Sequence, residues 1–152
     1  MVIRAGPAPI ALVLALAGLA AACGGGGESS DEASITAVAP ENGRIEVVAS
    51  EWGFTPNGLL LTVGEDVTIQ LENDGRILHD FKIAAIPADV VRSESSGPLE
   101  ADEGDVFVGA DSGASGTLEI VPLEAGSYDF YCTIAGHREL GMEGTVVVQA
   151  AP

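Results

Sequence analysis

The chain has 152 residues and a formal net charge of −17, a length that suits one ordinary domain behind a short leader. So acidic a surface repels nucleic-acid phosphates and anionic lipid headgroups, and we expect no nucleic-acid partner. The charge is compatible with docking to a basic partner and with tolerance of high salt.

The N-terminal segment is predicted to be an export signal. Arg4 is the only charged residue before Cys23, and the run from Ile10 to Ala22 is apolar or small. This run is shorter than the roughly 20 residues that span a bilayer, and it fits the core of a secretory signal. Its end, LAGLAAAC, resembles the lipobox of bacterial lipoproteins, although Ala20 stands where that family usually has leucine. We therefore expect residues 1–22 to be a signal peptide and Cys23 to be acylated; the alternative is an ordinary signal peptide and a stray cysteine.

Residues 23–43 are expected to be the lipid-bearing cysteine followed by a flexible tether. The stretch GGGGESSDEASITAVAPENG is rich in glycine, serine, alanine and acids, and shows no sustained periodicity. A flexible chain of this length reaches roughly 25 Å. The sequence thus predicts a lipoprotein on the outer face of the cell membrane, in the extracytoplasmic or periplasmic space.

Residues 44–152 are predicted to form one all-β domain. The stretch VTIQLE alternates apolar and polar side chains, which is typical of a half-buried strand, and turn signals such as Asn73-Asp74-Gly75 separate the strands. The segment 87–105 is expected to be a long, solvated connection with at most one short helix. About seven or eight strands of a β-sandwich are expected, at residues 45–54, 59–63, 67–72, 78–83, 106–110, 117–120, 127–132 and 145–149.

Two residues with metal-binding side chains are expected to point into the core. In LHDFKI, His79 shares a strand face with Phe81, and in SYDFYC, Cys132 shares a face with Phe130. A buried imidazole requires partners for its ring nitrogens. A histidine and an unpaired thiol, both beside apolar rings, indicate a metal site.

The loop FYCTIAGHRELGMEG adds His137 and Met142, spaced evenly after Cys132. Each has an ordinary alternative: a small buried thiol, a solvated loop histidine, a methionine that fills a gap. Together with His79, however, these residues exhaust the histidines, the second cysteine and the one methionine that follows the leader. Two imidazoles, a thiolate and a weak thioether form the ligand set of a blue-copper electron-transfer site.

The loop itself suits an electron-transfer role. Its glycines allow a tight turn around an ion. His137 lies in the middle of the loop, and we expect its ring edge to reach solvent. Ile134, Ala135 and Leu140 are expected to form an apolar rim around that edge, and small apolar surfaces serve weak redox encounters.

The stretch YDFYCTIAGHRELGMEGTVVV, with the upstream ENDGRILHDF, resembles the cupredoxin family. The spacing is most similar to that of the rusticyanin, auracyanin and sulfocyanin group, and the resemblance covers residues 45–150. It implies a Greek-key β-sandwich and one type 1 copper ion bound by His79, Cys132, His137 and Met142.

The chain departs from that family pattern at two positions. Ala135 stands where many relatives have proline, which implies a less stiff loop. Asp80 stands where many relatives have asparagine, a position that often bonds across to the ligand loop. An ionised carboxylate cannot donate a hydrogen bond, so the reduction potential and its pH dependence are expected to differ.

The expected function is a one-electron shuttle, not an enzyme: a monomer that cycles between Cu(I) and Cu(II), anchored to the membrane by lipid, with redox partners such as a membrane electron-transfer complex. A binuclear copper centre needs two cysteines in one loop, and multicopper enzymes need further histidines, which the chain lacks. Structural zinc accepts cysteine and histidine but binds methionine poorly. The main alternative is a lipoprotein that carries or delivers copper.

Overall fold

The structure is a computed structural model that describes residues 37–152. The predicted signal peptide, Cys23 and most of the predicted tether lie outside the described residues. Within the described part, no helix is long and apolar enough to cross a membrane. The strands are β1 (Ala37–Val38), β2 (Arg44–Ser50), β3 (Gly53–Thr55), β4 (Gly58–Thr62), β5 (Val67–Asn73), β6 (His79–Ile83), β7 (Ala88–Glu94), β8 (Val106–Ala110), β9 (Ser115–Pro122), β10 (Gly126–Tyr131) and β11 (Glu143–Gln149), with one short 3-10 helix, η1 (Arg138–Leu140).

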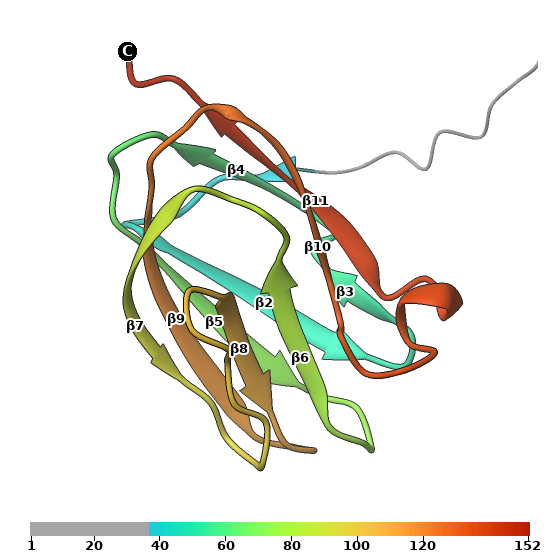
Figure 1. The fold of residues 1–152 in the computed structure, drawn as a ribbon. Helices are drawn as coiled ribbons and strands as arrows, with labels where there is room; N and C mark the ends of the chain where they lie inside the picture. Colours follow the sequence, from blue (N-terminus) through green and yellow to red (C-terminus); the bar gives the residue numbers. More distant parts are fainter. Residues whose placement is uncertain (1–36) are drawn as a thin grey trace, which may run out of the picture. The chain divides into compact units, whose positions relative to one another are not determined.

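The strands form two sheets that face each other, which confirms the expected all-β sandwich (Figure 1). The six-stranded sheet has the order β1-β4-β11-β10-β6-β8, and the five-stranded sheet has the order β3-β2-β5-β9-β7. Parallel pairs join β4 to β11 and β2 to β5, whereas β10 runs antiparallel to both β6 and β11.

Alternating side chains build the core between the sheets. On β2, Ile45, Val47 and Ala49 are buried while their neighbours face outward or are half-buried. Burial of each large apolar side chain stabilises the fold by about 1.5–3 kcal/mol. The same alternation on β9 buries Leu118 and Ile120 against the opposite sheet.

The segment 45–54, expected as one strand, is two strands. β2 ends at Ser50, and the chain turns through Glu51 and Trp52 so that β3 pairs antiparallel with the end of β2, with Ala49 opposite Phe54. This hairpin keeps both Ala49 and Phe54 buried, whereas a continuous strand would point side chains five residues apart to opposite faces, so the alternation itself carried a signal of the break.

The segment 87–105 was wrongly expected to be an irregular connection, because its first half forms β7. β7 pairs with β9 on one side only and is the edge of its sheet. Nearly all its residues are exposed, including Val90 and Val91, so it lacks the alternation that marks a half-buried strand. β1 is a second addition: it lies in the predicted tether and pairs with β4.

The topology brings both predicted ligand segments to one end of the six-stranded sheet. β6 begins at His79, and its antiparallel neighbour β10 ends at Tyr131, immediately before Cys132. The chain then forms a loop and returns as β11, where Glu143 pairs with Tyr131. The loop that carries His137 therefore starts and ends at the same end of the sheet at which β6 begins.

Three phenylalanines pack beneath this end of the sheet. The rings of Phe81 and Phe130 have their centroids 4.7 Å apart, and Phe54 meets both rings edge-on at 5.9 and 5.3 Å. Such pairs add about 0.5–1.5 kcal/mol beyond the burial of their area. The cluster gives the ligand segments a rigid apolar floor.

Candidate metal centre

Three of the four predicted ligands meet at the end of the six-stranded sheet where β6 begins and β10 ends. One ligand atom each from His79, Cys132 and His137 lies within 4.8 Å of the other two. The Cys132 sulfur is 3.4 Å from His137 Nδ1, and the two imidazole centroids are 5.1 Å apart. All three residues are buried. Segments more than fifty residues apart in the chain thus converge on one small volume.

The ring nitrogens of His79 fit a cluster that holds a further group. The residue is fully buried, and within residues 37–152 neither ring nitrogen has a hydrogen-bond partner. An unsatisfied buried polar atom costs about 1–3 kcal/mol. A metal ion would satisfy one nitrogen directly. The donor set of two imidazoles and a thiolate suits a transition metal such as copper or zinc, so the residues fit the implied copper ion.

Met142 lies at the base of the same loop. It is fully buried, and its backbone oxygen accepts a 3.1 Å hydrogen bond from the Cys132 N–H. Its own N–H donates to the His137 carbonyl, also at 3.1 Å. The backbone therefore links the three loop residues in one unit, and Met142 stays a predicted ligand on this geometry.

The loop between Cys132 and Met142 is closed by η1 and a left-handed glycine. His137 precedes η1, and its N–H donates to the Ile134 carbonyl at 3.0 Å. Gly141 ends η1 with φ of 104°, a conformation that costs glycine little and other residues more. Its N–H donates to the Arg138 carbonyl, so the turn is held by backbone bonds on both sides of His137.

Arg138 ties the loop to the hairpin beneath it. Its guanidinium contacts Glu143 at 2.8 Å and Asp129 at 3.2 Å, and it lies 4.2 Å from the centroid of the Tyr131 ring. The two acids and the ring come from β10 and β11. These contacts restrain the residue next to His137 in a loop whose position 135 is alanine.

Asp80 bonds across to the ligand loop, as the family resemblance implied for this position. Its carboxylate only accepts hydrogen bonds, whereas an asparagine there could also donate. The carboxylate accepts from the Thr133 N–H at 2.7 Å and from the Thr133 hydroxyl at 2.8 Å. Asp80 is fully buried. Burial raises the pKa of the Asp80 carboxyl, and the two bonds from Thr133 partly offset that rise.

Burial also keeps the metal-free ligands uncharged. It raises the pKa of the Cys132 thiol, a rise that backbone hydrogen bonds from Asp80 and Ile134 partly offset. It lowers the pKa of His79, and the neighbouring His137 lowers it further. The metal-free site therefore holds a neutral thiol and a neutral imidazole near pH 7, and an incoming cation must displace the thiol proton.

Two residues of the site escaped the sequence reasoning: Glu51 and Trp52, in the turn between β2 and β3. The Trp52 ring meets His137 with centroids 4.8 Å apart and His79 at 6.5 Å. It covers His137, of which only 6% is exposed, so the expected solvent-exposed ring edge was wrong. The available signal was the single tryptophan of the chain, placed in a polar interruption of an apolar strand.

Comparison with known proteins finds a family model and several relatives that match this chain. The profile of the family described as "Cupredoxin-like domain" matches residues 10–148. The copper-resistant cuproprotein CopI of Rubrivivax gelatinosus is 36% identical over 107 residues, which cover 68% of this chain and 64% of that protein. Auracyanin-A of Chloroflexus aurantiacus is 29% identical over 155 residues, covering 91% and 94%. This chain thus spans just under two thirds of the Rubrivivax protein.

A solved structure supports the fold. Dithionite-reduced auracyanin from Roseiflexus castenholzii superposes with a TM-score of 0.56 at 23% identity, over 72% of this chain and 98% of that one. At that identity the likeness bears on the arrangement of the strands.

Proposed function

The chain belongs to the cupredoxin-like family, and from this premise we propose that it is a type 1 copper protein that passes single electrons between redox partners. The observation that carries the proposal is the buried cluster of His79, Cys132 and His137, with ligand atoms within 4.8 Å of one another and His79 otherwise unsatisfied. A bound copper ion would supply the one-electron couple between Cu(II) and Cu(I).

The chain's own residues suit such a couple in two ways. The ligands come from strand ends and a short loop held by backbone bonds, so their positions need to change little between oxidation states. The phenylalanine cluster and Trp52 keep water away from the site, and a dry shell of this kind helps set the potential.

An electron would enter or leave through the surface above His137. Trp52 is 42% exposed and touches the His137 ring, and Leu140 of η1 is 57% exposed. A small apolar surface suits the brief contacts of redox partners. The net charge of −17 favours a partner with a basic face, because complementary charge speeds encounter.

We place the protein at the extracytoplasmic face of the cell membrane, held by lipid on Cys23. That assignment rests on residues 1–23 of the sequence. One acyl chain binds membranes marginally, whereas several chains hold a protein stably. Intact-mass analysis of the protein from a membrane fraction tests it, because acylation adds a defined mass to a chain beginning at Cys23.

The function is tested by loading the purified domain with Cu(II). We expect an intense absorption toward the red end of the visible spectrum that a mild reductant bleaches reversibly. Cys132→Ser should abolish the band while the fold persists, because serine cannot supply the thiolate. Retention of the band in that variant would contradict the proposed ligand set.

Copper handling is the second candidate, and one observation favours it: a relative of 36% identity is named a copper-resistant cuproprotein. The two functions differ in how firmly Cu(I) is held. A shuttle keeps copper through many redox cycles beside a competing chelator, whereas a carrier releases Cu(I) readily. The buried ligands and the single methionine after the leader favour retention.

A further inference from the structure

A bound ion would satisfy only one of the two nitrogens of the His79 ring. The ring is fully buried, and both nitrogens lack a hydrogen-bond partner within the described part of the chain. Metal-ligating histidines almost always donate their second ring N–H to a carboxylate, a carbonyl or water. His79 therefore needs an acceptor for the N–H of its second ring nitrogen.

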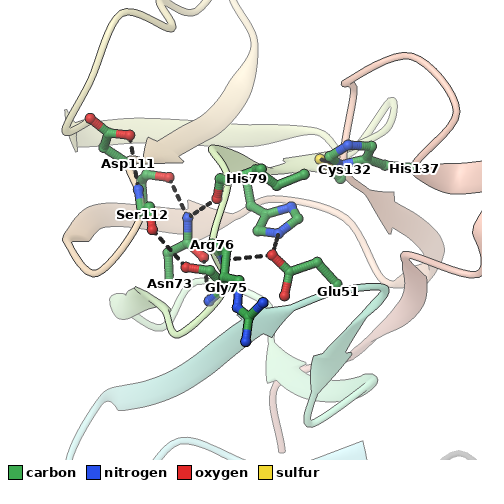
Figure 2. Close-up of polar contacts among 11 residues, drawn as sticks. Glu51, Asn73, Gly75, Arg76, His79, Asp111, Ser112, Cys132 and His137 are labelled. Atoms are coloured by element: carbon green, nitrogen blue, oxygen red, sulfur yellow. Dashed lines mark hydrogen bonds and ion pairs between the residues drawn. The ribbon is translucent and has the colours of Figure 1, made fainter.

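Glu51 Oε1 lies 4.0 Å from His79 Nε2, on the side of the ring away from Cys132 and His137 (Figure 2). We propose that Glu51 accepts the Nε2–H of His79 in the metal-loaded protein, and that it is thereby a positioning residue that leaves Nδ1 to bind the ion. This inference rests on the proposed metal site and adds the residue that selects the ligand atom.

The backbone around Glu51 holds the carboxylate in place. Glu51 Oε1 accepts a 2.5 Å hydrogen bond from the Arg76 N–H (Figure 2). Arg76 lies in the loop between β5 and β6, and Asn73 secures that loop through its side-chain amide, which donates to the carbonyls of Ile77 at 2.8 Å and Ala110 at 2.9 Å. The carboxylate is therefore fixed to the same loop that leads into His79.

Gly75 keeps the space between the two groups open. A Cβ at this position would lie 2.8 Å from His79 Nε2 and 3.0 Å from Glu51 Oε1. Real Cβ atoms hardly ever approach a neighbour that closely, so a side chain here would push the carboxylate and the ring apart. The bare backbone at Gly75 is what permits Glu51 to face Nε2.

The present distance is longer than a hydrogen bond, which requires about 2.7–3.2 Å. The Glu51 side chain is 31% exposed, so its carboxylate can turn toward the ring while it keeps its bond to Arg76, whereas the His79 ring is fully buried. Functional hydrogen bonds are often long in the unliganded state and tighten in the working complex. A carboxylate movement of about 1 Å completes the bond.

A carboxylate acceptor raises the basicity of the imidazole more than a neutral carbonyl acceptor does. A more basic imidazole favours the more highly charged Cu(II) over Cu(I). Loss of such a partner typically costs 10–100-fold in metal affinity. We therefore expect Glu51→Ala to weaken Cu(II) binding by about that factor and Cu(I) binding by less.

The test compares Glu51→Gln and Glu51→Ala with Glu139→Gln. Glu139 is an exposed acid of η1, so its variant removes one charge near the site without touching His79. Glutamine at position 51 keeps the shape and an acceptor oxygen but not the charge. Both Glu51 variants should raise the reduction potential, by about 59 mV for each tenfold change in the ratio of Cu(II) to Cu(I) affinity. An equal rise in Glu139→Gln would overturn the proposal, because it would show a general charge effect.

A second measurement does not depend on copper. Nitrogen-15 shifts of labelled histidine report the tautomer of His79 in the metal-free protein. We expect the Nε2–H tautomer in the wild type and a loss of that preference in Glu51→Ala. An unchanged tautomer in the variant, or an Nδ1–H wild type, would overturn the proposal. Failure of the wild type to bind copper would overturn the proposed function, while this measurement still decides the contact.

Discussion

The Cys132 sulfur and His137 Nδ1 lie 3.4 Å apart. Ligand bonds of about 2.0–2.3 Å to one metal ion place two ligand atoms roughly 3.5–4 Å apart. The pair is therefore already near the separation that a shared ion requires. The loop gains this arrangement from the backbone bonds that join Cys132 to Met142 and Met142 to His137.

Copper uptake should release about one proton per ion near pH 7. Burial raises the pKa of the Cys132 thiol, so the metal-free protein holds the proton that the thiolate form must lose. The lowered pKa of His79 means that this ring has no proton to give up at neutral pH. The apparent affinity should then rise about tenfold per pH unit below the thiol pKa. Calorimetry in buffers of different ionisation enthalpy counts the proton.

The matched control for that count is Cys132→Ser, which keeps both imidazoles but has no thiol proton. Copper bound by this variant should release no proton near pH 7. A wild-type count close to zero would show that the thiol is already ionised, or that sulfur is not a ligand.

Asp80→Asn should raise the reduction potential. The buried carboxylate lies beside the ligand loop, where its negative charge stabilises Cu(II) more than Cu(I). Asparagine removes the charge, and its NH2 group replaces one of the two carboxylate oxygens that accept separately from the Thr133 N–H and hydroxyl. Because burial raises the pKa of Asp80, the wild-type potential should also climb as the pH falls and the carboxylate takes up a proton. Protein voltammetry between about pH 4 and 8 measures both effects.

Thr133→Val is the companion variant for Asp80, since it removes the hydroxyl donor at 2.8 Å and keeps the carboxylate. The less neutralised charge should lower the potential, opposite in sign to Asp80→Asn. Equal potentials in all three proteins would exclude Asp80 as a determinant.

Much of this site could be predicted because its signals are local. The alternation in LHDFKI and SYDFYC placed His79 and Cys132 on inward faces, and the structure buries both. The spacing of His137 and Met142 after Cys132 defined one loop between two strands, which is the loop observed. Strand period and ligand type carry this information in neighbouring residues.

The remainder depended on contacts between distant segments. Nothing near Trp52 in the sequence indicates that its ring lies against His137, because the two meet only when β2 and the ligand loop are assembled. The edge strand β7 was missed for the reason that its valines face solvent and break the expected alternation. Asp80 lies on the opposite strand face from His79, yet it is buried and bonds to Thr133 of the ligand loop, a contact that strand alternation does not predict.

Trp52→Ala should open the site to small molecules. The Trp52 ring covers His137, which is only 6% exposed, and its removal leaves an imidazole edge in contact with water. We expect faster reduction by a small soluble reductant and faster copper loss to a chelator, both followed by the decay of the visible band. Leu140→Ala is the control, because Leu140 is a still more exposed apolar residue and lies in the ligand loop itself. Equal rates in both variants would mean that Trp52 does not shield the ion.

Phe130→Ala tests whether the apolar floor is structural and separable from the metal chemistry. Phe130 is fully buried, and its ring packs against Phe81 at 4.7 Å and Phe54 at 5.3 Å. Truncation of a buried phenylalanine costs about 3–5 kcal/mol, because it removes apolar burial and leaves a cavity. Urea unfolding of the metal-free protein should show a loss of that size, whereas Leu123→Ala, at a residue 51% exposed, should change stability by less than about 0.5 kcal/mol.

The copper-loaded form of Phe130→Ala completes that test. Phe130 lies two residues before Cys132 and supplies no ligand atom, so the folded variant should keep its visible band when measured well below its unfolding midpoint. Copper that binds only the folded state adds stability according to its concentration over its dissociation constant, by about 2.7 kcal/mol at a hundredfold excess. Loading should therefore recover much of the loss. A variant that is stable but colourless would show that the floor also sets the geometry of the ligands, and that the ring of Phe130 must be counted as part of the site.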